Sequence, residues 1–196
     1  NVTTDNMSTF KFLSWLVVEV ETSDGHIGIG NAALSPKPCK SVVDNYLKAA
    51  VVGENIWDYE QIWQKMYRQT LAWGRKGVGM TAISAVDIAI WDALGKAAKQ
   101  PVYSLLGGKT KSKLPCYASK LYSQPLDTLA KEAKEYLDQG FKAMKLRFGW
   151  GPKDGAEGMN KNIELIKTVR SVVGENVDLM ADVYMGWTFE YAKRMM

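Results

Sequence analysis

Apolar residues in the first half of the chain follow first a strand-like and then a helix-like spacing. The runs Trp15–Val20 and Ile27–Gly30 are typical of β-strands, and Ser23-Asp24-Gly25 between them has the composition of a tight turn. We therefore predict a β-hairpin. After Pro38, apolar residues recur at every third or fourth position, which predicts helices. Their expected ranges are 42–50, 59–71 and 80–98.

Strand-like and helix-like segments alternate after Lys113. Strands are expected at 116–118, 143–146 and 177–181, and helices at 126–137, 159–169 and from about Thr188. This alternation is typical of βαβ units with a parallel sheet. We predict an α+β domain over residues 1–112 and the first units of a β/α (TIM-type) barrel over residues 113–196. A complete barrel takes about 250 residues, so we expect an incomplete barrel and the N-terminal portion of a longer protein.

The C-terminal ends of two expected strands carry charged residues. Lys145 and Arg147 close the apolar run that begins at Phe141, and Asp182 closes the run that begins at Val177. Side chains two residues apart along a strand point to the same side, and burying two unpaired cations among helices is costly. We therefore expect Lys145 and Arg147 in the barrel mouth, the face where such barrels carry their chemistry. Two cations and a carboxylate there indicate a metal-assisted site for an anionic substrate.

Other polar and aromatic residues give weaker functional indications. Tyr184 lies on the same side as Asp182 and could hydrogen-bond a ligand or a neighbouring carboxylate, whereas Asp182 alone could also cap the turn that follows it. Asp87 and Asp92 are five residues apart on an expected helix and do not share a face. We therefore expect capping or inter-domain hydrogen bonds from these two aspartates. The tryptophans at helical spacing are expected in the core: Trp57, Trp63, Trp73 and Trp91.

Composition narrows the function classes. The net charge of +4 comes from cations scattered among acids, without the basic stripe that nucleic-acid binding requires. No uninterrupted apolar run approaches the roughly 20 residues of a membrane-spanning helix, and residues 1–9 lack a signal-peptide pattern. We therefore expect a cytoplasmic protein with neither membrane nor nucleic-acid partners. Cys39 and Cys116 suit a reducing compartment, and His26, the only histidine, is expected at the surface of the hairpin turn.

Two segments carry a resemblance to a known family. Ser84–Lys96, with the sequence SAVDIAIWDALGK, and Pro101–Gly108 resemble the junction between the capping domain and the barrel in the enolase superfamily, mandelate racemase/muconate lactonizing enzyme subgroup. The K-x-R triplet ending at Arg147 and the later Asp182-Val183-Tyr184 match the positions of its second-strand cations and first metal ligand. The stretch Trp150–Gly155 is similar to acid-sugar dehydratases of the L-rhamnonate dehydratase type.

The resemblance implies a capping domain over a modified barrel and a Mg²⁺ ion held by three acidic residues, of which Asp182 would be the first. It implies a dehydratase that removes the proton next to the carboxylate of a sugar acid and expels the β-hydroxyl, giving a 2-keto-3-deoxy acid. Lys145 and Arg147 would stabilise the developing negative charge. Superfamily sites combine a Lys or His base with Mg²⁺, and the metal ion stabilises the same charge.

Capping-domain loops near Asn1–Phe12 and Ala33–Cys39 would close over the sugar. The other metal ligands and a His-Asp dyad would lie outside this chain, and the full-length enzyme is expected to be a homo-oligomer.

Two departures from the subgroup pattern affect the expected reaction. Many relatives carry K-x-K with the second lysine as a base, but here Arg147 stands in that place and is nearly always protonated. Tyr184 stands where asparagine is frequent. Both departures favour a dehydratase over a racemase, epimerase or cycloisomerase. A third alternative is a non-catalytic interaction protein, because half a barrel exposes a strand edge and apolar surface.

Overall fold

The computed structural model describes residues 2–10 and 13–196. It contains two compact units, Asn1–Thr110 and Lys111–Met196, and the boundary predicted from the sequence falls two residues beyond this division. Each unit has its own hydrophobic core. The first unit is α+β and the second is built from β/α elements.

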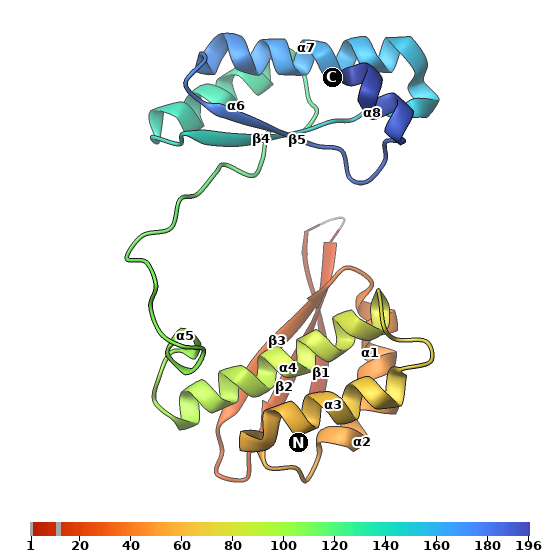
Figure 1. Ribbon diagram of the computed structural model, residues 1–196, viewed down its shortest axis with the longest axis vertical. Helices are drawn as coiled ribbons and strands as arrows, with labels where there is room; N and C mark the ends of the chain where they lie inside the picture. The colour runs from red at the N-terminus through yellow and green to blue at the C-terminus, as the bar shows by residue number, and fades with distance from the viewer. Residues whose placement is uncertain (1, 11–12) are drawn as a thin grey trace. The chain divides into compact units, whose positions relative to one another are not determined.

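The first unit contains a three-stranded antiparallel sheet in the order β1-β2-β3 (Figure 1). The strands are β1 (Val2–Phe10), β2 (Leu13–Glu21) and β3 (Ile27–Ala33). The hairpin between β2 and β3 confirms the sequence prediction, and Gly25 takes a φ of 87° in its turn. β1 corrects the expectation of a loop near Asn1–Phe12, since residues 2–10 pair with β2. Residues 1, 11 and 12 of that expected loop lie outside the described residues.

Helices follow the sheet in close succession. A continuous helical stretch comprises α1 (Pro36–Val42), the π-helical turn η1 (Val43–Leu47) and α2 (Lys48–Val51). The expected loop Ala33–Cys39 is therefore wrong, because only Leu34 and Ser35, both with positive φ, separate β3 from α1. The remaining helices of the unit are η2 (Ile56–Asp58), α3 (Tyr59–Thr70), α4 (Val78–Ala97) and α5 (Val102–Leu105).

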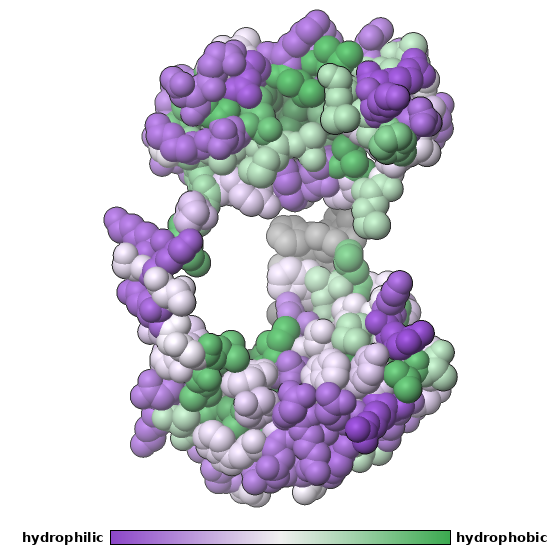
Figure 2. Space-filling model, in the orientation of Figure 1, coloured by the Kyte–Doolittle hydropathy of each residue, from purple (hydrophilic) through white to green (hydrophobic). Residues whose placement is uncertain are grey.

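α3 is amphipathic, with apolar residues on one side and polar residues on the other. Ile62 and Met66 are fully buried, whereas the side of α3 turned to the viewer in Figure 2 is mostly hydrophilic. The predicted core role holds for Trp63 and Trp91, which pack against this core. It is wrong for Trp57 and Trp73, which are 54% and 50% exposed, because Trp57 lies in the short turn η2 and Trp73 lies beyond the end of α3, so neither follows a regular helix.

α4 lies across the sheet (Figure 1) and approaches β3 very closely. A Cβ atom at Gly28 would lie 1.9 Å from the carbonyl oxygen of Ala89, and one at Gly30 would lie 1.9 Å from that of Ala85. Glycines on the strand and alanines on the helix therefore let the two backbones touch. Ala85, Ala89 and the neighbouring Ala93 are fully buried as a result.

Two side chains of α4 also close the outer edge of β3. The carboxylate of Asp92 accepts a hydrogen bond of 2.8 Å from the backbone N–H of Ile29, and the ammonium of Lys96 donates one of 2.6 Å to the carbonyl of Ile27. Lys96 and Asp92 form an ion pair of 2.8 Å. Asp92 thus has the structural role expected of it, although its hydrogen bonds stay within one domain.

α4 is the one helix among the described residues that is long and apolar enough to cross a membrane, by length and composition alone. It is not an uninterrupted apolar run, because Asp87, Asp92 and Lys96 lie within it. In its most apolar window, 56% of the helix is buried inside the unit. A core helix meets the same criterion, so the finding is weak evidence for a membrane span.

The second unit alternates helices and parallel strands. Its elements are α6 (Leu126–Asp138), β4 (Ala143–Arg147), η3 (Pro152–Asp154), α7 (Gly155–Val173), β5 (Asp178–Asp182) and α8 (Phe189–Met195). β4 and β5 pair in parallel, with α6 and α7 on one side of them (Figure 1). The strand expected at 116–118 is reduced to a single parallel bridge between Ala118 and Met144.

The core of the second unit lies between the strands and these helices. Met144 and Leu146 of β4 are buried against Leu129 of α6 and Leu165 of α7. This burial settles the direction of the alternate residues on β4, which point away from the helices. Consecutive β/α units with a parallel strand pair match the predicted start of a barrel, while the barrel itself remains a prediction.

Candidate functional site

The C-terminal ends of β4 and β5 lie side by side. Arg147 and Asp182 are direct partners in the parallel register, and Lys145 pairs with Met180. The backbone N–H of Phe148 continues the pairing with a 3.0 Å hydrogen bond to the carbonyl of Asp182. The three charged residues singled out in the sequence therefore share one edge and one side of the sheet.

Both cations face the same carboxylate. Lys145 Nζ lies 3.0 Å from Asp182 Oδ2, and Arg147 Nε lies 3.7 Å from the same oxygen. The side chains are only partly accessible, with exposed fractions of 20% for Lys145, 14% for Arg147 and 25% for Asp182. Partial exclusion of water strengthens such interactions relative to those on an open surface.

The surroundings of Asp182 stabilise its ionised form. The hydrogen bond from Lys145, the backbone N–H of Tyr184 and the positive charges of Lys145 and Arg147 together lower the pKa of Asp182 from its usual value. Tyr184 N–H donates to Asp182 Oδ1 over 3.1 Å. Asp182 is thus a carboxylate at neutral pH, with one oxygen held by the backbone and the other by cations.

Tyr184 contributes through its backbone rather than its hydroxyl. It has a φ of 49°, followed by Met185 with a φ of 58°. Left-handed backbone is unfavourable for such residues, yet here it turns the Tyr184 N–H toward the carboxylate. The side chain of Tyr184 is 62% exposed, and its ring centre lies 6.0 Å from Arg147 Cζ. The expected hydrogen bond from its hydroxyl to a neighbouring carboxylate is not among those found for the described residues.

Sequence reasoning missed Ser119 and Tyr122. The Arg147 guanidinium lies 4.5 Å above the ring of Tyr122 and donates a 2.6 Å hydrogen bond to the carbonyl of Ser119. Both residues lie within four positions of Ala118, the end of the first expected strand. Neighbouring parallel strands end at one edge of a sheet, so this position was the available signal.

The described residues do not form a complete metal site by themselves. No group of three His, Cys, Asp or Glu residues capable of holding a metal occurs among them. The ionised carboxylate of Asp182 has the donor chemistry that Mg²⁺ prefers. It fits the role of a single ligand, and a complete site would need further oxygen donors.

The loops beyond the strand ends line an open pocket of about 460 Å³. Its wall is formed by residues 148–154 after β4 and by residues 183, 184, 186 and 187 after β5. The carbonyl of Trp150 joins these two loops, because it accepts a hydrogen bond from Trp187 Nε1 at 2.9 Å. It also accepts one from Asn162 Nδ2 of α7 at 3.0 Å. Trp187 also stacks on Phe148.

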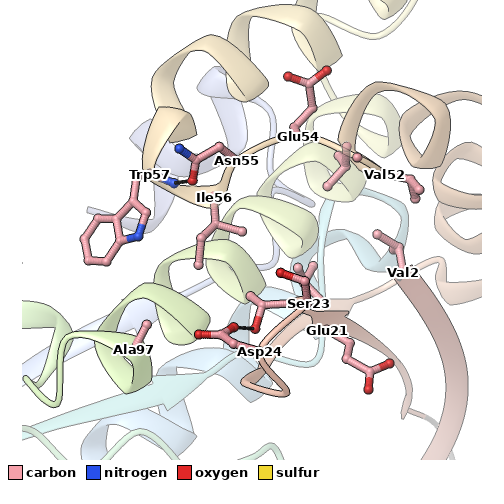
Figure 3. A pocket seen from close by; sticks show the side chains of 14 residues that line it. Val2, Glu21, Ser23, Asp24, Val52, Glu54, Asn55, Ile56, Trp57 and Ala97 are labelled. Atoms are coloured by element: carbon pink, nitrogen blue, oxygen red, sulfur yellow. Dashed lines mark hydrogen bonds between the residues drawn. The ribbon is translucent and has the colours of Figure 1, made fainter.

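A separate cavity of about 560 Å³ lies in the first unit, near the β2–β3 turn and the connection after α2 (Figure 3). Its acidic side chains include Asp24 and Glu54, which pair with His26 and Lys65. None of the described residues that line this cavity is a lysine or an arginine, so it offers no cation to an anionic substrate. His26 lies at the turn, as predicted, where it faces Asp24.

Comparison with known proteins decides the family. The model described as "Mandelate racemase / muconate lactonizing enzyme, N-terminal domain" matches residues 3–107, and "Enolase C-terminal domain-like" matches residues 128–196. This chain belongs to the mandelate racemase/muconate lactonizing enzyme family of the enolase superfamily. The resemblance seen in the sequence is thereby confirmed.

The relatives of this family member include acid-sugar dehydratases. An L-rhamnonate dehydratase from Saccharopolyspora erythraea is 41% identical over 93% of this chain and 44% of that protein. An arabinonate dehydratase from Saccharolobus solfataricus is 37% identical over 92% of this chain and 48% of that protein. A solved racemase from Streptomyces coelicolor A3(2) with bound magnesium has a TM-score of 0.89 and 30% identity over 100% of this chain and 57% of that one. The chain thus spans about half the length of the curated relatives it matches.

Proposed function

We propose that this chain is part of a Mg²⁺-dependent acid-sugar dehydratase. It would supply the capping domain and the active-site residues at the ends of β4 and β5. The observation that carries the proposal is the Asp182 carboxylate held between Lys145 and Arg147 at the ends of two parallel strands. The dehydratase relatives support the reaction type. The magnesium-bound racemase structure supports the choice of metal.

The reaction would start with a sugar acid whose carboxylate lies near Lys145. Removal of the proton on the adjacent carbon places negative charge on the carboxylate oxygens, and the cations at Lys145 and Arg147 stabilise that charge. A bound Mg²⁺ ion, with Asp182 as one ligand, would supply Lewis-acid stabilisation of the same oxygens. Loss of the β-hydroxyl as water, after it receives a proton, gives an enol that rearranges to a 2-keto-3-deoxy acid.

None of the described residues at this site suits the role of the base that abstracts the proton. Arg147 remains protonated in proteins and makes a poor base, and Lys145 is paired with Asp182. The single histidine, His26, is in the other unit and pairs with Asp24. We propose that the base comes from a part of the full-length enzyme outside this chain.

Racemisation is the second candidate reaction, favoured by the likeness to the racemase structure. Arg147 stands where a second-strand lysine base would be needed, so a one-base elimination agrees better with the residues present. The two reactions differ in a single measurable event, which is loss of water.

The test uses the full-length enzyme that contains this chain, incubated with MgCl₂ and a panel of five- and six-carbon sugar acids. Formation of a 2-keto acid is the expected result. Exchange of the α-proton with solvent, without any keto acid, would show that the dehydratase assignment is wrong.

Asp182→Asn tests the metal role within the same enzyme. We expect Mg²⁺ binding, measured by calorimetry, to weaken by at least about tenfold, a loss found even for groups that only support a metal ligand. Asp178→Asn is the matched control, because Asp178 begins the same strand and is exposed. Equal Mg²⁺ affinity in the Asp182 variant and the wild type would remove Asp182 from the ligand set.

A further inference from the structure

The chain segment beside β4 departs from regular strand pairing just where Arg147 meets it. Ala118 N–H donates to the Ala143 carbonyl at 3.0 Å, and Lys145 N–H donates to the Ala118 carbonyl at 2.9 Å. Pairing resumes only at Leu121, whose carbonyl accepts from Arg147 N–H at 3.0 Å. Leu121 has a φ of 51° although it is fully buried. The backbone therefore turns out of the sheet between Ala118 and Leu121.

The guanidinium of Arg147 forms hydrogen bonds with backbone carbonyls of this turn. Nη1 donates to the Ser119 carbonyl at 2.6 Å and contacts the Lys120 carbonyl at 3.4 Å. Nη2 lies 3.3 Å from Ser119 Oγ, and the ring of Tyr122 lies under the guanidinium plane at 4.5 Å. A planar fork of donors suits this arrangement, which an ammonium group cannot reproduce.

Little of the Arg147 side chain is left for a ligand. Its Nε faces Asp182 at 3.7 Å and makes no hydrogen bond. Lys145 differs in this respect: its ammonium pairs with Asp182 at 3.0 Å and lies 5.7 Å from the ring of Tyr117. One flexible ion pair is easier to exchange for a new anion than several hydrogen bonds to backbone carbonyls.

We propose that Arg147 has a second role besides supplying positive charge: it is a positioning residue that clamps the Ser119–Tyr122 turn to β4. This role does not rest on the proposed function, because the contacts that carry it lie within the described turn and strand.

Hydrogen exchange of backbone amides, followed by NMR on the 196-residue chain, tests the clamp. The Arg147 amide reports the contact with Leu121 directly. In Arg147→Met and in Arg147→Lys we expect its exchange to accelerate by at least about tenfold, because the turn carbonyls lose a charged partner. In Lys145→Met we expect exchange within about twofold of wild type, since no turn contact is lost. Wild-type protection in Arg147→Lys, or equal loss in Lys145→Met, would overturn the clamp.

A spectroscopic signature separates the clamp from general stabilisation. A guanidinium held by several hydrogen bonds rotates slowly, so we expect separate Nη–H signals for Arg147 in nitrogen-edited spectra of the wild type. If the Ser119 hydroxyl holds Nη2, these signals merge in Ser119→Gly. A single averaged Nη signal in the wild type would contradict the proposal, even in variants that fold.

Discussion

Asp87 and Asp182 show how one type of side chain acquires opposite properties. Cations and a backbone N–H lower the pKa of Asp182. Asp87 is partly buried between helices, and burial, together with the nearby charge of Glu60, raises its pKa. The folded protein therefore favours the ionised form of one aspartate and the neutral form of the other. The two residues must respond to pH in opposite directions.

Asp87→Asn should stabilise the first unit at neutral pH. A raised pKa means that the folded state prefers protonated Asp87, so its favourable contribution is complete below the unfolded value of 3.8 and is lost as pH rises through the folded pKa. The amide removes this loss. Thermal unfolding at pH 7 should show a higher Tm for the variant, and the difference should shrink as pH falls toward 4. Glu175→Gln, an exposed acid in the other unit, serves as the control, and a pH-independent difference would contradict the argument.

At the scale of elements, the contact between α4 and β3 limits what the sheet can tolerate. The strand presents glycines where the helix presents alanines, and the backbones meet without intervening side chains. Asp92 and Lys96 add hydrogen bonds to the edge of β3 from the same helix. The position of α4 on the sheet is therefore fixed chiefly by its contact with β3.

Gly30→Ala should destabilise the first unit by about 1–3 kcal/mol or more, the usual cost of overpacking. Its new Cβ would meet the Ala85 carbonyl at 1.9 Å, which neither backbone can avoid without moving. Asn31→Ala is the matched control, because Asn31 is adjacent but exposed on the other side of the sheet. Urea unfolding measures both variants, and equal midpoints would show that α4 shifts freely.

Sequence patterns predicted the elements better than their contacts. The hairpin and the main helices follow from periodicity, and the meeting of Lys145 with Asp182 follows from parallel strands ending at one edge. β1 was missed because Val2–Phe10 mixes polar and apolar residues without alternation. The bonds from Arg147 to Ser119 depend on the left-handed turn at Leu121, which no propensity of leucine indicates.

At the scale of the whole molecule, the chain divides its packing between two cores. Buried residues from Val2 to Leu94 form one cluster, and those from Ala118 to Val177 form the other. The cap and the strand-end site therefore draw their stability from different sets of residues. The residues assigned to charge stabilisation all belong to the second set.

A fragment of residues 1–110 should fold without the second unit, since its core residues are all its own. We expect cooperative unfolding in urea and amide signals that overlay those of the whole chain, apart from residues close to the cut. A fragment without a cooperative transition would show that the first unit depends on the second. Introducing Gly30→Ala into the fragment should lower its midpoint as it does in the whole chain.

The hydrogen bonds from Asp92 and Lys96 to β3 also limit the edge at which the sheet could pair with a further strand. An unpaired strand edge is a template for a strand from another chain. In the described sheet the edge at β3 is obstructed by α4, so a foreign strand can add only next to β1. Association through this sheet would therefore stop at a pair of molecules joined β1 to β1, since this sheet has no second open edge from which a fibre could extend.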